Sequence, residues 1–107
     1  HEAIPMIHVV ATIEVAEGKR SQFLEEFRKL VPLVQEEEGC LEYGPTIDFE
    51  TNIEAQGGVR PNVVTVVEKW ESIEALEAHL IAPHMIDYRG RVKDMVIGAR
   101  LQVLQPV

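Results

Sequence analysis

Residues 63–88 read VVTVVEKWESIEALEAHLIAPHMIDY and contain a strand pattern followed by helix patterns. The first eight residues, 63–70, begin with the apolar run VVTVV and end with Glu68 and Trp70, which is typical of a buried strand. Ser72 is then suited to cap a helix. The apolar residues at helical spacing are Ile73, Leu76 and Leu80. Pro83 interrupts this helix and favours the start of a second one, so the stretch predicts a strand and two short helices.

The chain before this stretch begins with a predicted strand, followed by one long predicted helix. IHVVATIEV at residues 7–15 places alternate apolar residues on one face, as a strand does. Phenylalanine, leucine and valine residues then recur at helical spacing over residues 19–37, with Pro32 expected to kink the helix. Gly39 is suited to the left-handed position that ends a helix, and the EEE run at 36–38 is interpreted as a solvated face.

Two further strands are predicted on either side of residues 63–88. CLEYGPTIDFE at residues 40–50 alternates between a hydrophobic and an acidic face, and Pro45 favours an edge position. The expected hydrophobic face is Leu41, Tyr43, Ile47 and Phe49. Residues 50–62 are expected to form a hairpin loop, and ARLQVLQ at 99–105 a last strand. In the second short helix the residues expected on one side are Met85, Tyr88, Val92 and Met95.

The order of elements predicts an α+β, ferredoxin-like βαββαβ fold, with an antiparallel sheet and helices on one face. The strand at 63–70 is apolar on both faces, however, with Val63 and Val67 opposite Val64 and Val66. Leaving one face exposed to water would forgo about 1.5–3 kcal/mol for each valine-sized side chain. We therefore expect a homodimer that packs sheet to sheet.

Composition limits the classes of function. A chain of 107 residues with a net charge of −8 is expected to form one domain, residues 1–107, with neither nucleic acid nor an anionic membrane as partner. No apolar run is long enough for a transmembrane helix, and no signal peptide is visible. The single Cys40 cannot form an internal disulfide, which fits a cytoplasmic location. Residues 1–5 are interpreted as a tag remnant or an extension before Met6, and the sequence leaves both open.

Five side chains of the segment 68–88 are candidates for one small-molecule site. Glu68 and Trp70 are two apart on a strand and project to the same face. His84 and Tyr88 are four apart on a helix and are therefore neighbours, while His79 lies beside the core stripe of its own helix. If the helices cover that face of the sheet, these residues line a cavity with an aromatic wall and a few polar groups.

The segment VVEKWESIEALEAHLIAPH at 66–84 resembles the signature of the antibiotic-biosynthesis-monooxygenase domain superfamily. In that signature a strand ends in an acid and an aromatic residue, and the next helix carries A-x-x-x-H before a second histidine. The first strand, the F-x-x-x-F of the long helix and EEEGCLEY at 36–43 are also similar, so the resemblance covers nearly the whole chain. It implies a dimeric α+β barrel.

The resemblance also implies an activity, a cofactor-independent monooxygenase that acts on a small phenolic or hydroquinone-like compound with O₂. Deprotonation of such a substrate gives an electron-rich anion, so the protein needs only to bind, orient and stabilise charge. Glu68, His79 and His84 match the family's acid and histidines, and Trp70 its pocket tryptophan. The family's polyketide oxygenases carry an asparagine where this chain has Val66. The asparagines typical of its haem degraders and its isomerase are also missing, which leaves the quinol type as the default.

Each candidate residue has a structural reading beside the catalytic one. Glu68 either takes part in catalysis or pairs strand to helix, and His79 is interpreted first as a hydrogen-bonding post that holds Glu68. His84 is the favoured proton-transfer residue, near the mouth of the pocket. Tyr43 and Tyr88 either line the wall of the pocket or pack in the core like ordinary apolar residues. A metal site is not expected, because H-x₄-H broken by a proline differs from the one-face histidine pair of zinc helices.

Three functions therefore remain open from the sequence. The first is the monooxygenase. The second is an isomerase of a small phosphorylated or dicarbonyl metabolite, which would work without O₂. The third is a non-catalytic dimer that binds a small ligand or haem. The loop at 50–62 is expected either to cover an entrance to the cavity or to reach the partner subunit.

Overall fold

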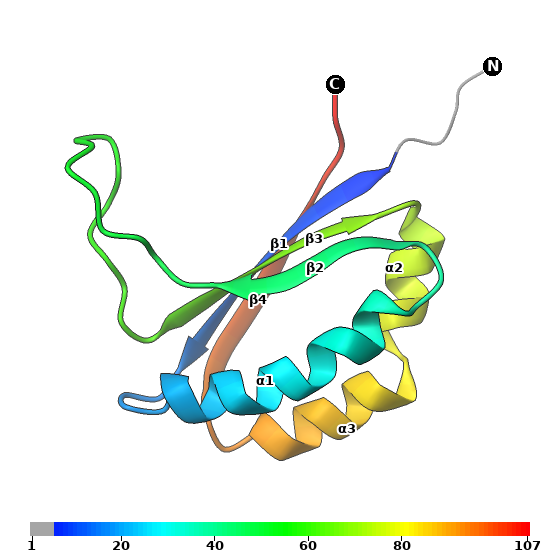
Figure 1. Ribbon diagram of the computed structural model, residues 1–107, viewed down its shortest axis with the longest axis horizontal. Coiled ribbons are helices and arrows are strands. Elements are labelled where there is room, and N and C mark those ends of the chain that lie inside the picture. The colour runs from blue at the N-terminus through cyan, green and yellow to red at the C-terminus, as the bar shows by residue number, and fades with distance from the viewer. Residues whose placement is uncertain (1–5) are drawn as a thin grey trace.

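The computed structural model describes residues 6–107, which form one four-stranded antiparallel sheet and three helices (Figure 1). In chain order the elements are β1 (Ile7–Val15), α1 (Arg20–Gln35), β2 (Cys40–Thr46), β3 (Val63–Trp70), α2 (Ile73–Leu80), α3 (Pro83–Val92) and β4 (Val96–Leu104). The predicted α+β, ferredoxin-like order is confirmed. Residues 1–5, interpreted above as a tag remnant or extension, lie outside the described residues.

The sheet has the strand order β2-β3-β1-β4, so β2 is an edge strand, as Pro45 predicts. All three helices lie on one face of the sheet, which we call the inner face (Figure 1). The core forms between the two layers. The largest fully buried side chains are Trp70, Phe23, Phe27, Leu30, His79, Val9, Val15, Val34, Val64 and Val66. A histidine among these residues is unusual, because a buried polar ring requires a partner.

The expected hydrophobic face of residues 40–50 is wrong except at Tyr43, which is buried. A bulge between Cys40 and Glu42 leaves one extra residue in β2 and breaks the alternation. The strand then ends at Thr46, and the chain leaves the sheet in a long loop, residues 47–62 (Figure 1). The apolar residues that are exposed as a result are Leu41, Ile47 and Phe49.

The end of α1 brings the following turn close to α2. The helix ends at Gln35, two residues earlier than predicted, and Gly39 has the expected positive φ, +85°. A Cβ atom at Gly39 would lie 2.5 Å from the Cβ of Ala75. Only glycine permits both this backbone angle and this approach. The turn at 36–39 therefore packs directly on α2.

The two short helices largely follow the sequence pattern. The Ser72 hydroxyl accepts a hydrogen bond from the Ala75 backbone N–H at 3.1 Å, as an N-cap does, and Pro83 occupies the first turn of α3. The prediction that Ile73 belongs to the core stripe is wrong, because this residue is exposed in the first turn of α2. Met95 is buried but lies beyond the end of α3, and β4 begins at Val96 rather than at residue 99.

The outer face of the sheet, opposite the helices, carries several apolar side chains. Val10 and Val63 are half-buried there, and Val67 is 41% exposed. Leu104 pairs with His8 and reaches the same face. No element among residues 6–107 covers this face. None of the helices in that range is long and apolar enough to cross a membrane.

Candidate active site

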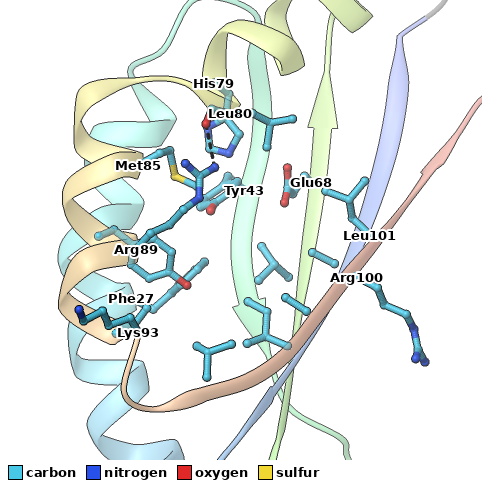
Figure 2. A pocket seen from close by; sticks show the side chains of 17 residues that line it. Phe27, Tyr43, Glu68, His79, Leu80, Met85, Arg89, Lys93, Arg100 and Leu101 are labelled. Atoms are coloured by element: carbon cyan, nitrogen blue, oxygen red, sulfur yellow. Dashed lines mark hydrogen bonds between the residues drawn. The ribbon is translucent and has the colours of Figure 1, made fainter.

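A cavity of about 500 Å³ lies between the inner face of the sheet and the helices (Figure 2). Its apolar wall includes Ala11, Ile13, Phe27, Val66, Leu80, Met85, Val92, Val96, Ala99 and Leu101. Its polar or aromatic lining includes Tyr43, Glu68, His79, Tyr88 and Arg89. A mostly apolar cavity of this size with a few convergent polar groups is typical of a small-molecule site.

Glu68 projects into the cavity from β3 and is nearly fully buried. The Trp70 indole N–H donates a hydrogen bond to Glu68 Oε1 at 2.9 Å, which follows from their spacing of two along the strand. Burial raises the pKa of Glu68 to about 7, although the Trp70 hydrogen bond opposes this change. Glu68 can therefore bind or release a proton near neutral pH.

His79 lies at the upper end of the cavity in Figure 2, next to Leu80, and is only 2% exposed. Its Nδ1 atom contacts the two carboxylate oxygens of Glu37 at 3.0 and 3.1 Å. Burial lowers the pKa of His79, while Glu37 acts in the opposite direction. The imidazole ring packs on Trp70 and Tyr43, with ring centroids 4.7 and 5.3 Å apart.

Two sequence predictions about this region are wrong. His79 does not hold Glu68, because its hydrogen bonds go to Glu37, and Glu68 is bonded by Trp70 instead. Glu37 is not part of a solvated face, because its side chain is only 13% exposed and bonds both His79 and the Nε2 atom of His84. The turn that packs on α2 accounts for both results, since it carries Glu37 into the helical layer.

Three polar side-chain atoms of the lining have no hydrogen-bond partner within residues 6–107. They are the hydroxyls of Tyr43 and Tyr88 and the second oxygen of Glu68, and none of the fully buried side-chain polar atoms in the same range is unpaired. Because these residues line the cavity, the three atoms are open to it. Burial raises the pKa of Tyr43 and of Tyr88, so both hydroxyls keep their protons at neutral pH.

Aromatic rings form the wall next to these hydroxyls. Tyr43 stacks on Phe27 with centroids 5.7 Å apart, and Tyr88 meets Phe27 edge to face at 5.5 Å. Pairs of this geometry are stabilising beyond the area that they bury. The wall therefore presents aromatic rings to the cavity.

Arg89 is the basic side chain that Figure 2 shows closest to His79. Its guanidinium donates a hydrogen bond to the Leu80 carbonyl at 2.7 Å, and it has no carboxylate partner within residues 6–107. Lys93 and Arg100 also border the cavity, but their charged ends point away from it in Figure 2. Arg89 therefore supplies the positive charge near the polar end of the cavity.

The structure does not bring all the predicted site residues to the cavity. Four of them line it: Glu68, His79, Tyr43 and Tyr88. Trp70 is fully buried behind Glu68 and His79, and His84 lies outside the lining with 25% of its side chain exposed. In the part of the chain that the structure describes, no group of three His, Cys, Asp or Glu side chains is placed to hold a metal ion.

The model of the antibiotic biosynthesis monooxygenase family matches residues 6–91, and the chain belongs to this family. An Escherichia coli K12 protein named "Probable quinol monooxygenase YgiN" is 40% identical over 103 residues, which are 94% of this chain and 98% of that protein. Among solved structures, a Caulobacter crescentus CB15 protein is 26% identical over 97% of this chain and 92% of its own, with a TM-score of 0.81. PA3566 from Pseudomonas aeruginosa is 21% identical over 100% of this chain and 99% of its own, with a TM-score of 0.82, and it shares the fold.

Proposed function

We propose that this protein is a cofactor-independent monooxygenase that oxidises a small phenolic or hydroquinone-like compound inside the cavity. The observation that carries this proposal is the presence of two proton acceptors, Glu68 and His79, in the lining of a mostly apolar and aromatic cavity. The relationship to the E. coli protein supports a quinol as the substrate type.

The chemistry requires only binding, deprotonation and protection from water. Loss of a proton from a hydroquinone gives an anion that can transfer electrons to O₂ and form a carbon–oxygen bond. One oxygen atom stays in the product as a hydroxyquinone and the other leaves as water, so the substrate supplies all four electrons that O₂ accepts. A low-dielectric cavity with fixed donors stabilises the anion without reorganisation.

The residues divide into three roles in this proposal. His79 and Glu68 accept the substrate proton, because both are open to the cavity and Glu68 titrates near neutral pH. The Tyr43 and Tyr88 hydroxyls donate to substrate oxygens, and Arg89 stabilises the developing negative charge. Trp70 acts from behind the cavity wall by fixing the orientation of Glu68.

We also propose that two copies associate through the outer face of the sheet. The apolar side chains that carry this proposal are Val10, Val63, Val67 and Leu104. A second copy packed sheet to sheet would bury all of them, which a single chain cannot do.

The activity is tested by oxygen uptake with a panel of hydroquinones, with ¹⁸O₂ used to trace the product. The expected result is one ¹⁸O atom per product molecule and a loss of at least about 100-fold in kcat/KM for the double variant His79→Gln, Glu68→Gln. Glu77→Gln, an exposed charge on α2, is the matched control and should keep wild-type activity. Turnover under anaerobic conditions would favour an isomerase, and ligand binding without turnover would favour a binding protein. Either outcome contradicts the proposal.

A further inference from the structure

The carboxylate of Glu37 joins two imidazoles that come from different helices. The carboxylate is hydrogen-bonded to Nδ1 of His79, which lies in the last turn of α2, and to Nε2 of His84, which lies in the first turn of α3. His79 is almost fully buried, while His84 keeps contact with solvent. The three side chains thus form a continuous chain of hydrogen bonds from the cavity wall to the surface.

Glu37 reaches this position because of the close approach of Gly39 to Ala75. Ala75 and His79 are four residues apart and lie on the same face of α2, so a turn that touches Ala75 also lies beside His79. The backbone holds the turn in place as well, since the Glu71 N–H donates to the Gly39 carbonyl at 2.8 Å. The position of Glu37 is therefore set by the backbone and not by its own flexible side chain.

We propose that Glu37 is the positioning residue of the site, which holds His79 with its proton on Nδ1 and with Nε2 free to act as the base toward the cavity. His84 shares the same carboxylate and links it to solvent. The catalytic part of this inference rests on the proposed function, whereas the state of the imidazole does not.

The hydrogen bonds favour this protonation state of His79. An ionised carboxylate can only accept, so the atom that faces it, Nδ1, must carry the hydrogen. Nε2 has no partner within residues 6–107, and the same region leaves no fully buried polar side-chain atom unpaired, so Nε2 must be open to the cavity that His79 lines. A neutral imidazole with a free Nε2 is a general base that is ready to accept a substrate proton.

Glu37 also stabilises the product of proton transfer. When the substrate O–H proton moves to Nε2, the ring becomes an imidazolium, and its bond to Glu37 becomes a charge-assisted pair. Without that carboxylate, a buried cation would carry a large desolvation cost. The ionisable or aromatic groups that face His79 are Glu37 from the turn, Tyr43 from β2, Trp70 and Glu68 from β3, and His84 and Arg89 from α3. Of these, Glu37 is the one that bonds Nδ1.

Nitrogen NMR of the imidazole rings tests the proposal without any substrate. In the wild-type protein above the His79 titration, we expect the Nδ1–H tautomer, with the Nε2 signal in the range of an unprotonated nitrogen. Glu37→Gln should shift the midpoint of the His79 titration down by about one pH unit, because the charge that favours the imidazolium is removed. Glu38→Gln, the exposed neighbour with the same change in charge, should leave tautomer and midpoint unchanged.

A wild-type His79 that carries its proton on Nε2 would overturn the inference, whatever the variants do. Equal titrations in wild type and Glu37→Gln would overturn it as well. If the protein oxidises a quinol, Glu37→Gln should reduce kcat for that quinol by about 10- to 100-fold, with KM little changed. The same variant should displace the pH profile of kcat. Glu38→Gln should have neither effect. If no quinol is oxidised by wild type but the NMR result holds, the monooxygenase proposal fails and the assignment of Glu37 stands.

Discussion

The indole N–H of Trp70 donates to the carboxylate of Glu68 at 2.9 Å, and both side chains lie on the inner face of β3. The carboxyl is nearly buried in a mostly apolar wall, so its ionised form has lost most of its water. One indole hydrogen bond replaces only part of that solvation. Glu68 is therefore a destabilising group when it is charged, and the fold accepts this cost at the position where it faces the cavity.

The stability of the protein should consequently fall as the pH rises from 4.5 to about 7. The pKa of Glu68 is raised from 4.5 to about 7 by burial, so the folded state binds its proton more tightly than the unfolded state does. The stabilisation from that proton is complete below pH 4.5 and is lost as the pH passes 7. The side chain in Glu68→Gln cannot ionise, so the stability of this variant should not fall for this reason over the same pH range.

Urea denaturation at pH 5 and pH 8 measures this difference. Between these pH values the wild-type free energy of unfolding should fall relative to that of Glu68→Gln by up to roughly 3 kcal/mol. Glu77→Gln removes an exposed charge and should follow the wild type. A parallel pH dependence of the wild type and Glu68→Gln would mean that Glu68 ionises normally in the folded state.

Trp70→Phe should move the titration of Glu68 further from its ordinary value. The variant removes the N–H that stabilises the carboxylate, so the pKa of Glu68 should rise above its wild-type value. Loss of part of a fully buried side chain should also destabilise the protein by roughly 2 kcal/mol. Carboxyl ¹³C chemical shifts of Glu68 across the pH range report the pKa directly.

Tyr43→Phe is the control for this titration, because Tyr43 lines the same cavity but does not bond Glu68. Its Glu68 titration should match the wild type. If Glu68 titrates with the same midpoint in Trp70→Phe and in Tyr43→Phe, the indole hydrogen bond has no effect on the pKa of the Glu68 carboxyl.

Periodicity predicted the fold because it reports which faces of each element are apolar. The alternation in β1, the helical spacing in α1 and the order of elements were sufficient for the sheet and its helical layer. The same reasoning failed in β2, where the bulge after Cys40 shifts the alternation by one residue. Such a bulge depends on pairing with β3, and no local pattern indicates it.

The candidate site was predicted only where its residues lie on regular elements. Glu68, His79 and Tyr88 follow from strand and helix spacing and line the cavity. Glu37 was missed because it lies in a turn, between the end of α1 and Gly39, where neither period applies. The one available signal was the glycine itself, since a left-handed position often marks where two elements approach closely.

Gly39→Ala should test that close approach. The backbone of the alanine would have to keep φ of +85°, and its Cβ would lie 2.5 Å from the Ala75 Cβ, so either the turn or α2 must move. Backbone strain and overpacking together should cost about 2–4 kcal/mol of the free energy of unfolding. The displaced turn should also weaken the contact between Glu37 and His79, which the His79 imidazole signals would report.

Gly18 provides a matched control for the backbone contribution. It has φ of +80°, but a Cβ there would meet nothing within 4 Å. Gly18→Ala should therefore lose only about 1–2 kcal/mol and leave the His79 signals unchanged. If the two alanine variants have equal stability, the contact between Gly39 and Ala75 is not tight in solution.

Association through the outer face of the sheet makes a prediction about charge. Val67 is apolar, 41% exposed and central on β3, between β1 and β2, so Val67→Lys would place an ammonium group in the proposed interface. A buried and unpaired charge costs several kcal/mol, which should convert a dimer to a monomer at micromolar concentration. Ile86→Lys makes the same change on α3, where the side chain is also exposed and points away from the core, and should remain dimeric. Sedimentation velocity distinguishes the two species by mass, and a wild-type protein that sediments as a monomer at these concentrations would contradict the proposed dimer.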